Sequence, residues 1–522
     1  MDEEKIFRLA KPVRKGLLHL VFSRFLIILL LLILQFGLLI VFYGWLFHLL
    51  PYAAAAQMVF TLIMVIYLFN IDMDTSGKLT WLFLIALLPL PGSVFLAFTR
   101  TNLGHRALKD AVQRRIAETR TVLTQDPDAL KSLEQEGDGG EDLVRYLNRS
   151  GCFPVYGDTA VDYYPSGEAL FPVLLETLEQ ARESIYLEFF ILEEGHMWGR
   201  ILEILTRKAR DGLDVRVMYD GMCEMFQLPP DYWKLLQAQG IQARPFAPIR
   251  PLVSSHYNYR DHRKILVVDG RVAFTGGVNL ADEYINRASR FGYWKDAAIR
   301  LQGGAARSFE LMFLQLWESH DPRAELCLPS PDRALPEGKA DGYVIPYCDC
   351  PLDEDRVGET VYIDILYRAT DYVHIMTPYL ILDGELEAAL KYAAQRGVDV
   401  KLILPGIPDK KSAYALAKSH YRTLTGAGVQ IFEYTPGFVH AKVVVSDNKK
   451  AVVGSINLDY RSLYHHFECA AYLYKTGCIP AIEQDFQETL RQCRPVTADS
   501  IRREKLGYRI LGTILKLIAP LL

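Results

Sequence analysis

The feature that most constrains this chain is a long motif that occurs twice. In each copy, a histidine and a lysine separated by one residue are followed, after four intervening residues, by an aspartate and, after six more, by Gly-Gly/Ser-x-Asn. The first copy runs from His262 to Asn279 and the second from His440 to Asn457. Repetition of so long a pattern indicates a duplicated structural unit. The chain is therefore expected to contain two related halves.

The residues after each His-x-Lys predict a strand and a hairpin. Residues 265–268 and 443–445 are apolar, which is typical of buried strands. Side chains two positions apart on a strand face the same side, so the histidine and lysine of each copy should project together. Asp269-Gly270 and Asp447-Asn448 are hairpin-turn pairs.

The returning strand of each hairpin should bring the motif asparagine back beside its own histidine. These asparagines are Asn279 and Asn457. The small residues Gly277 and Ser455 precede them and would let a bulky ligand approach the backbone. Each half is thus expected to present one imidazole, one ammonium and one carboxamide on a common face.

These groups could bind and cleave a phosphate diester. Lys264 and Lys442 can neutralise the non-bridging oxygens, and the asparagines can donate hydrogen bonds to them. One histidine can attack phosphorus as a nucleophile. The other can protonate the leaving alkoxide, a role worth about 10²–10⁴-fold in rate. Since two lysines and two asparagines offset the phosphate charge, neither a metal nor another cofactor is required.

The two motifs and their surroundings resemble the phospholipase D superfamily and, within it, the bacterial cardiolipin synthases. The resemblance extends over roughly residues 184–486. Its most specific segments are Tyr259-Arg260-Asp261-His262-Arg263-Lys264, Thr275-Gly276-Gly277-Val278-Asn279, Tyr293-Trp294-Lys295-Asp296, Thr377-Pro378-Tyr379, Gly437-Phe438-Val439-His440-Ala441-Lys442 and Gly454-Ser455-Ile456-Asn457-Leu458-Asp459-Tyr460-Arg461-Ser462.

The resemblance implies a two-step transfer between lipids. A histidine, expected to be His262, attacks the phosphate of one phosphatidylglycerol and expels glycerol. The phosphatidyl-histidine is then taken by a hydroxyl of a second phosphatidylglycerol, which gives cardiolipin. His440 would serve as general acid and then as general base. Acids downstream of the motifs, Asp296 and Glu468, would orient the imidazoles.

Two features of the motifs leave alternatives open. Asp269 and Asp447 belong to the catalytic motif of the family, but their position in the turns also fits a fold-holding role. Where the family tends to have Asn-Phe-Glu, this chain has His465 and His466 before Phe467-Glu468. These two histidines would either line the lipid entrance or make local hydrogen bonds.

The composition narrows the possible partners. A net charge of −4 and a pI near 6.3 argue against a nuclease, which needs a basic surface. The eight cysteines form no Cys-x-x-Cys pair and show no zinc spacing. The expected partners are therefore lipids, with neither nucleic acid nor a metal.

Three uncharged runs near the N-terminus predict membrane segments. They cover residues 25–50, 53–69 and 79–99, and the third is interrupted by Pro89-Leu90-Pro91-Gly92. Basic residues flank the runs on both sides, which favours the cytoplasm for both flanks. The sequence predicts a multi-pass protein of the bacterial inner membrane with a cytoplasmic catalytic region, and leaves the number of crossings open.

The C-terminal residues 506–522 predict an amphipathic helix. Arg509, Thr513, Lys516 and Pro520 recur at helical spacing in an otherwise apolar segment. Such a helix would lie in an anionic membrane surface, and the alternative is a helix docked on the catalytic region.

The predicted fold class is α/β, with two pseudo-symmetric phospholipase D-like sandwich halves that share one active site. Glu188, in the middle of an apolar strand, would occupy either a solvent-facing position or the wall of the site. The predicted regions are a membrane region 1–102, a charged linker 103–150, a first half 151–325, a linker 326–341, a second half 342–500 and a membrane-surface helix 501–522.

The motifs do not distinguish a phosphatidyltransferase from a phospholipase D-type hydrolase, because only the acceptor differs. The apolar segments and the extent of the resemblance favour the transferase. A catalytically inactive lipid-binding protein is a further alternative, and the presence of both histidines and both lysines speaks against it.

Overall fold

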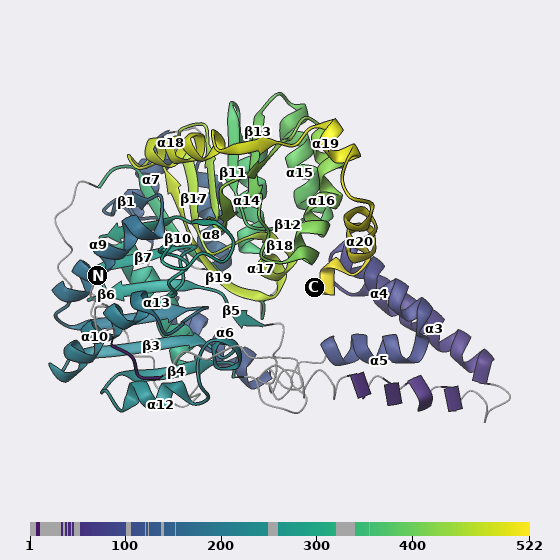
Figure 1. The fold of residues 1–522 in the computed structure, drawn as a ribbon, viewed down its shortest axis with the longest axis horizontal. Coiled ribbons are helices and arrows are strands. Elements are labelled where there is room, and N and C mark those ends of the chain that lie inside the picture. Colours follow the sequence, from purple (N-terminus) through teal and green to yellow (C-terminus); the bar gives the residue numbers. More distant parts are fainter. Residues whose placement is uncertain are drawn as a thin grey trace.

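The structure is a computed structural model of the full chain. It describes residues 7–10, short helical stretches between 33 and 45, and residues 53–100, 106–120, 122–123, 125–136, 140–151, 153–248, 259–319, 340–353 and 355–521. Two mixed sheets, each covered by helices, form the body of the molecule, and α3–α5 extend away from it (Figure 1).

The first half is built on a sheet of seven strands in the order β1-β9-β7-β6-β2-β3-β4. The strands are β1 Ala160–Tyr164, β2 Ser184–Phe189, β3 Asp214–Asp220, β4 Gln242–Phe246, β6 Lys264–Val268, β7 Val272–Gly276 and β9 Ala298–Gln302. Its helices are α9 Gly167–Gln180, α10 His196–Arg210, α11 Cys223–Phe226, α12 Tyr232–Gln237 and α13 Ala305–Glu318. Helix α13 is almost entirely buried because it packs against strands of both sheets.

The second half is built on a sheet of nine strands, eight of them in the order β10-β19-β17-β16-β11-β13-β14-β20. These are β10 Tyr343–Asp349, β11 Tyr372–Met376, β13 Asp399–Pro405, β14 Gln430–Tyr434, β16 Val443–Ser446, β17 Lys450–Gly454, β19 His466–Tyr474 and β20 Cys493–Pro495. The helices are α14 Val357–Arg368, α15 Gly384–Gln395, α16 Lys411–Gly426, α17 Tyr460–Tyr464 and α18 Ile479–Leu490. Strands β12 Leu380–Ile381 and β18 Leu458–Asp459 pair separately.

The predicted internal repeat is visible in the strand pairing. In the first half, β2 is parallel to β3 and antiparallel to β6, and in the second half β11 is parallel to β13 and antiparallel to β16. Both predicted hairpins form, β6–β7 and β16–β17. Both central turn residues have positive φ in each hairpin, at 53° and 62° for Asp269-Gly270 and at 54° and 51° for Asp447-Asn448. That backbone is the one hairpin turns of this kind require.

Two short strand pairs join the halves. Strand β5 (Arg260–Asp261) lies parallel to the start of β19, and β8 (Tyr293–Lys295) lies parallel to β15 (Gly437–Val439). Each pair places the segment before a motif histidine next to the segment before an acid of the other half. The consequence for the site is described below.

The region predicted as a charged linker contains three helices, α6 Arg106–Thr119, α7 Pro127–Glu136 and α8 Gly140–Gly151. Leu143, Val144 and Leu147 of α8 lie in the same hydrophobic core as the second sheet, and α6 packs on α13. These helices therefore cover the catalytic body. Most of the second predicted linker, 326–341, lies outside the described residues.

The N-terminal helices are α3 Ala53–Asn70, α4 Thr75–Leu87 and α5 Pro89–Arg100. The break between α4 and α5 occurs at Leu88, directly before Pro89, as the proline pattern predicts. Most of the first apolar run, 25–50, falls outside the described residues. Among the helices that are described, none combines the length and the apolar character needed to cross a membrane.

The C-terminal helix α20 (Leu506–Leu517) follows α19 (Ala498–Arg502) and precedes the short turn η2 (Ala519–Leu521). Helix α20 packs on α16, and a side chain at buried Gly512 would lie 2.3 Å from the carbonyl oxygen of Ala415. Its apolar side chains Leu506, Ile510, Ile514 and Leu517 are exposed. The helix is therefore docked on the protein and also presents an apolar surface beside α4 (Figure 1).

Candidate active site

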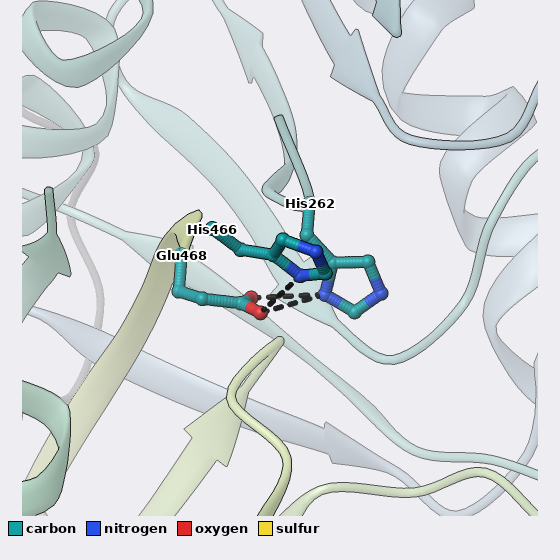
Figure 2. A group of neighbouring side chains, drawn as sticks. All are labelled: His262, His466 and Glu468. Atoms are coloured by element: carbon teal, nitrogen blue, oxygen red, sulfur yellow. Dashed lines mark hydrogen bonds and ion pairs between the residues drawn. The ribbon is translucent and has the colours of Figure 1, made fainter. Parts of the chain in front are cut away.

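The two motif histidines are each held by a carboxylate of the opposite half. His262 Nδ1 lies 2.9 and 3.0 Å from the two carboxylate oxygens of Glu468, as Figure 2 shows. His440 Nδ1 lies 2.7 Å from Asp296 Oδ2. The acid downstream of each motif therefore serves the other motif, and the site is a composite of both halves.

The strand pairs between the halves produce this crossed arrangement. Because β5 runs parallel to β19, the His262 amide donates to the Phe467 carbonyl at 2.9 Å, one residue before Glu468. Because β15 runs parallel to β8, the His440 amide donates to the Lys295 carbonyl at 2.7 Å, one residue before Asp296. Backbone pairing thus sets the position of each imidazole against its acid.

The motif lysines lie beside their histidines, as the strand spacing predicts. Lys264 Nζ donates to the His262 carbonyl at 2.5 Å, and Lys442 Nζ donates to the His440 carbonyl and lies 3.0 Å from its Nδ1. Both lysines are only 1% exposed. Burial lowers the pKa of Lys264 to about 8 and that of Lys442 to about 7. An arriving phosphate would stabilise both as cations.

Burial also lowers the pKa of both imidazoles. The pKa of His262 is well below its usual value, and the nearby charges of Lys264, His466 and Lys442 lower it further. The pKa of His440 falls to about 4 because burial and Lys442 outweigh the opposing effect of Asp296. Without substrate, both rings are therefore neutral, and each has one nitrogen facing away from its carboxylate.

The two carboxylates respond differently to the same burial. Burial works to raise the pKa of Asp296, but the charge and hydrogen bond of His440 hold it below the usual value. Burial raises the pKa of Glu468 well above the usual value, and Lys264 and Ser455 offset this only in part. Asp296 is therefore an anion beside His440, whereas the pKa of Glu468 beside His262 stays above its usual range.

The small motif residues Gly277 and Ser455 lie against the acids. Ser455 Oγ donates to Glu468 Oε2 and accepts from the Cys469 amide at 3.0 Å. A side-chain carbon at Gly277 would lie 2.0 Å from Asp296 Oδ1. These contacts assign both positions to the support of a carboxylate, a role different from the ligand approach that the sequence suggested.

The motif asparagines are not equivalent. Asn279 Oδ1 accepts from the Ile191 amide at 3.0 Å, and its Nδ2 donates to the Tyr284 hydroxyl at 2.8 Å. Tyr284 in turn lies edge-on to His440, with ring centroids 5.4 Å apart. Asn457 Oδ1 is buried and has no hydrogen-bond partner among the described residues. Asn279 thus supports the site through Tyr284, and Asn457 keeps an open polar atom.

The motif aspartates bind the backbone. Asp269 accepts hydrogen bonds of 2.7–3.2 Å from the amides of residues 182, 183 and 184. Asp447 accepts bonds of 2.9–3.0 Å from the amides of residues 370, 371 and 372. Within the described chain, neither carboxylate bonds a motif histidine. The contacts fit the fold-holding interpretation and do not support the chemical role that the motif suggested.

Comparisons with known proteins agree with this site. The family described as "Cardiolipin synthase, PLD-like domain" matches residues 174–291 and 362–490, which include both motifs. A cardiolipin synthase of Halalkalibacterium halodurans is 31% identical over 462 residues, covering 88% of this chain and 91% of the relative. This chain belongs to the cardiolipin synthase family.

One further relative and one solved structure are also similar to this chain. An uncharacterised protein of Streptococcus mutans is 53% identical over 458 residues and covers 88% of this chain and 99% of its own. The crystal structure of phosphatidylserine synthase from Haemophilus influenzae Rd KW20 has a TM-score of 0.54 at 14% identity, covering 73% of this chain and 99% of its own. That structure shares the phospholipase D-like fold of this cardiolipin synthase family member.

Sequence reasoning missed a buried ion pair next to the first motif of this cardiolipin synthase family member. Glu188 is fully buried and accepts from Arg263 Nε at 2.5 Å, so its predicted solvent-facing position is wrong, and the alternative place in the wall of the site stays a prediction. Arg263 is the variable residue of the first His-x-Lys and points away from the two neighbours that share its motif. The sequence signal for this buried ion pair was an arginine between the motif histidine and lysine, together with a glutamate in an apolar strand.

Proposed function

We propose that this protein is a cardiolipin synthase that transfers the phosphatidyl group of one phosphatidylglycerol to another and releases glycerol. Named cardiolipin synthases at 31% and 32% identity, aligned over 86–88% of the chain, support this substrate class. The observation that carries the mechanism is the pair of buried imidazoles, each held by a carboxylate from the opposite half.

The first step forms a covalent intermediate. The Nε2 lone pair of His262 attacks phosphorus, and the bond between phosphorus and the headgroup glycerol breaks. His440, neutral in the free site, takes up a proton as the anionic substrate binds, and its Nε2 then gives that proton to the departing alkoxide, which leaves as glycerol. Lys264 and Lys442 stabilise the non-bridging oxygens as charge builds on them. Glu468 steadies the His262 ring, whose single N–H proton lies on Nδ1.

The second step reverses the first with another alcohol. The primary hydroxyl of a second phosphatidylglycerol loses its proton to His440 and bonds to phosphorus. The phosphorus–nitrogen bond to His262 then breaks, which returns a neutral His262 and releases cardiolipin. Each imidazole regains its starting protonation state, so the cycle requires neither a metal nor another cofactor.

The environment of each ring supports this division of roles. Asp296 raises the pKa of His440 both by its charge and by its hydrogen bond, which eases protonation of that ring. For His262, by contrast, the leading influences all lower the pKa, so its lone pair stays available. A ring that accepts a proton readily suits the general acid and base, and a ring that stays neutral suits the nucleophile.

A bilayer is the natural source of both substrates. Both α20 and α3 have exposed apolar side chains, and α4 packs against α3 and against the turn η2 that follows α20. We therefore place this face against the cytoplasmic side of the bacterial inner membrane, with α20 in the interface. The Ile510→Ser/Ile514→Ser double variant should reduce binding to phosphatidylglycerol vesicles, while Thr513→Ser, on the same helix, should not.

The orientation has its own test. A cysteine introduced at Asp158, in a loop of the catalytic body, should resist an impermeant thiol reagent in intact cells and react after the cells are opened. Rapid labelling of intact cells would place the catalytic body outside the cytoplasm.

The decisive experiment is incubation of the detergent-purified protein with phosphatidylglycerol alone. Cardiolipin and glycerol in equal amounts are expected. Phosphatidic acid and glycerol without cardiolipin would instead identify a phospholipase D-type hydrolase, in which water replaces the second lipid. Lipid binding with no product at all would favour an inactive lipid-binding protein. A chelator should change the rate little.

A further inference from the structure

His466 is a buried imidazole whose ring nitrogens make no hydrogen bond within the described part of the chain. The residue is 8% exposed. Polar atoms left unpaired in a protein interior are uncommon and call for an explanation. The mechanism proposed above does not use this residue.

The ring of His466 lies beside the His262–Glu468 pair (Figure 2). Its centroid is 5.3 Å from the His262 ring, and its Nδ1 is 3.6 Å from Glu468 Oε1. That separation is too long for a hydrogen bond, so His466 approaches Glu468 without bonding it. The parallel pairing of β5 with β19 fixes this arrangement, because it sets His466 opposite Arg260, two residues before His262.

The spacing of these three groups matches the coordination shell of a divalent transition metal. One ligand atom from each of His262, His466 and Glu468 lies within 4.8 Å of the others. Zinc binds histidine nitrogen and carboxylate oxygen at roughly 2.0–2.2 Å in tetrahedral geometry, which separates neighbouring ligand atoms by about 3.4 Å. The distances of 2.9 Å from Glu468 Oε1 to His262 Nδ1 and 3.6 Å to His466 Nδ1 fall on either side of that value.

We propose that His262, His466 and Glu468 form an inhibitory site for a zinc-like divalent ion. Two imidazoles and one carboxylate, with a fourth position left for water, are a zinc ligand set. The inhibitory part of the proposal rests on the proposed role of His262 as nucleophile, whereas the binding part rests on geometry alone.

Binding would disable the nucleophile by moving one proton. A neutral imidazole carries a single N–H, and in the active form that proton lies on Nδ1 toward Glu468. When the ion bonds Nδ1, the proton must reside on Nε2 instead. The Nε2 lone pair that attacks phosphorus is then lost, although His262 remains neutral and nothing is oxidised or reduced. Any proton carried by Glu468 is released to solvent.

The surrounding charges make this a reversible inhibitor site. Lys264 and Lys442 lower the pKa of His262, and as cations they would also repel a metal ion bound to that residue. The anionic phosphate of the substrate is attracted by the same lysines. Ion and lipid should therefore compete, and a high concentration of phosphatidylglycerol should relieve inhibition.

The first test measures binding without reference to activity. The purified full-length protein is titrated with Co²⁺, whose visible absorption reports a four-coordinate nitrogen and oxygen site, and then with Zn²⁺, which should displace it. One ion per chain is expected. Loss of a residue that only hydrogen-bonds a metal ligand lowers metal affinity by about 10–100-fold. His466→Asn removes a ligand itself, so it should weaken binding by about 100-fold or more.

A matched control comes from another buried histidine–glutamate pair. His420 is 1% exposed and its Nδ1 lies 3.0 Å from Glu387 Oε2, but it is not part of the three-residue group. His420→Asn should leave the Co²⁺ spectrum and affinity unchanged. An unchanged spectrum in His466→Asn, or its loss in His420→Asn with the fold intact by circular dichroism, would overturn the proposal.

The second test links binding to transfer. Zn²⁺ should inhibit cardiolipin formation by the unmodified protein, and a chelator should reverse the inhibition. His466→Asn should resist Zn²⁺ when its rate is compared with its own metal-free rate. Equal inhibition of His466→Asn and the unmodified protein would overturn the inhibitory role. If the protein forms no cardiolipin yet binds Co²⁺ through His466, the proposed function fails while the metal site stands.

Discussion

The two histidine–carboxylate pairs are formed in the same way, across the two halves, but from different acids and different small residues. In one pair, the short acid Asp296 lies against Gly277 and holds His440. In the other, the longer Glu468 receives a hydrogen bond from Ser455 and holds His262. A serine thus supports the longer acid, whereas a glycine leaves room for the shorter one.

The difference shows how a duplicated unit becomes an asymmetric site. Each acid is supported by the small residue of its own half and orients the histidine of the other half. Neither half could therefore assemble a complete pair alone. The two acids also differ in pKa, because His440 keeps the pKa of Asp296 low while burial keeps that of Glu468 high. Two chemically distinct imidazoles follow from two copies of one motif.

The largest effects should come from the histidines themselves. His262→Ala and His440→Ala should each reduce transfer by at least about 10⁴-fold, since each removes a group that takes part in both steps. The two variants should differ in the trapped species. With labelled phosphatidylglycerol and rapid acid quench, His440→Ala should still yield some lipid–protein adduct, and His262→Ala none. An adduct on His440 in the His262→Ala protein would reverse the roles.

Replacing the acids should sharpen the comparison at a smaller scale. Asp296→Asn should lower transfer by about 10²–10⁴-fold, because the amide no longer favours the imidazolium of His440. The charge and hydrogen bond of Asp296 keep the pKa of His440 from falling below about 4, so the loss of Asp296 should lower that pKa further. The limb of the pH–rate profile that reports protonated His440 should therefore move to lower pH.

Glu468→Gln is the matched variant and should leave that limb in place. It acts on His262, so it should slow adduct formation in single-turnover measurements. Movement of the His440 limb in Glu468→Gln, but not in Asp296→Asn, would mean that each acid serves its own half in solution.

The sequence was a good guide to the repeat and a poor guide to the connections between its copies. Hydrophobic periodicity and turn residues predicted both hairpins, and the lysines lie where the strand spacing put them. The crossed pairing depends on β5–β19 and β8–β15, which join residues far apart in sequence, so local pattern carries no information about it. The partner of Glu188 was missed for the same reason, since Arg263 lies between β5 and β6, far from Glu188 in sequence.

The two small residues, Gly277 and Ser455, can each be replaced by the residue of the other half. Gly277→Ser places a side chain where Asp296 Oδ1 lies, 2.0 Å from the new carbon, so Asp296 must move away from His440. Transfer should fall nearly as far as in Asp296→Asn. Ser455→Gly removes the hydrogen bond to Glu468 and the one accepted from the Cys469 amide. A hydrogen bond to a charged acceptor is worth about 1.5–3 kcal/mol, so the rate should fall by about 10–100-fold. Steady-state cardiolipin assays on both variants test the order, and a larger loss in Ser455→Gly would refute it.

The smallest effects on chemistry should come from the turn aspartates, whose variants should change stability instead. Asn tolerates the positive φ at both positions, so Asp269→Asn and Asp447→Asn isolate the loss of carboxylate acceptors. Asp269 is 7% exposed, and its loss should lower the free energy of unfolding by about 1–3 kcal/mol. Asp447 is half-buried and should cost less. Urea unfolding of both variants measures the difference.

The pH dependence of that stability follows from Asp447. Although burial works to raise its pKa, the backbone amides of residues 370, 371 and 372 hold the pKa below the usual value. Its stabilisation is therefore complete above the unfolded pKa of about 3.9 and is lost as the pH falls through the lower, folded value. The stability gap between the unmodified protein and Asp447→Asn should narrow on acidification from pH 5. A gap that stayed constant through this range would show that the carboxylate charge does not hold the turn.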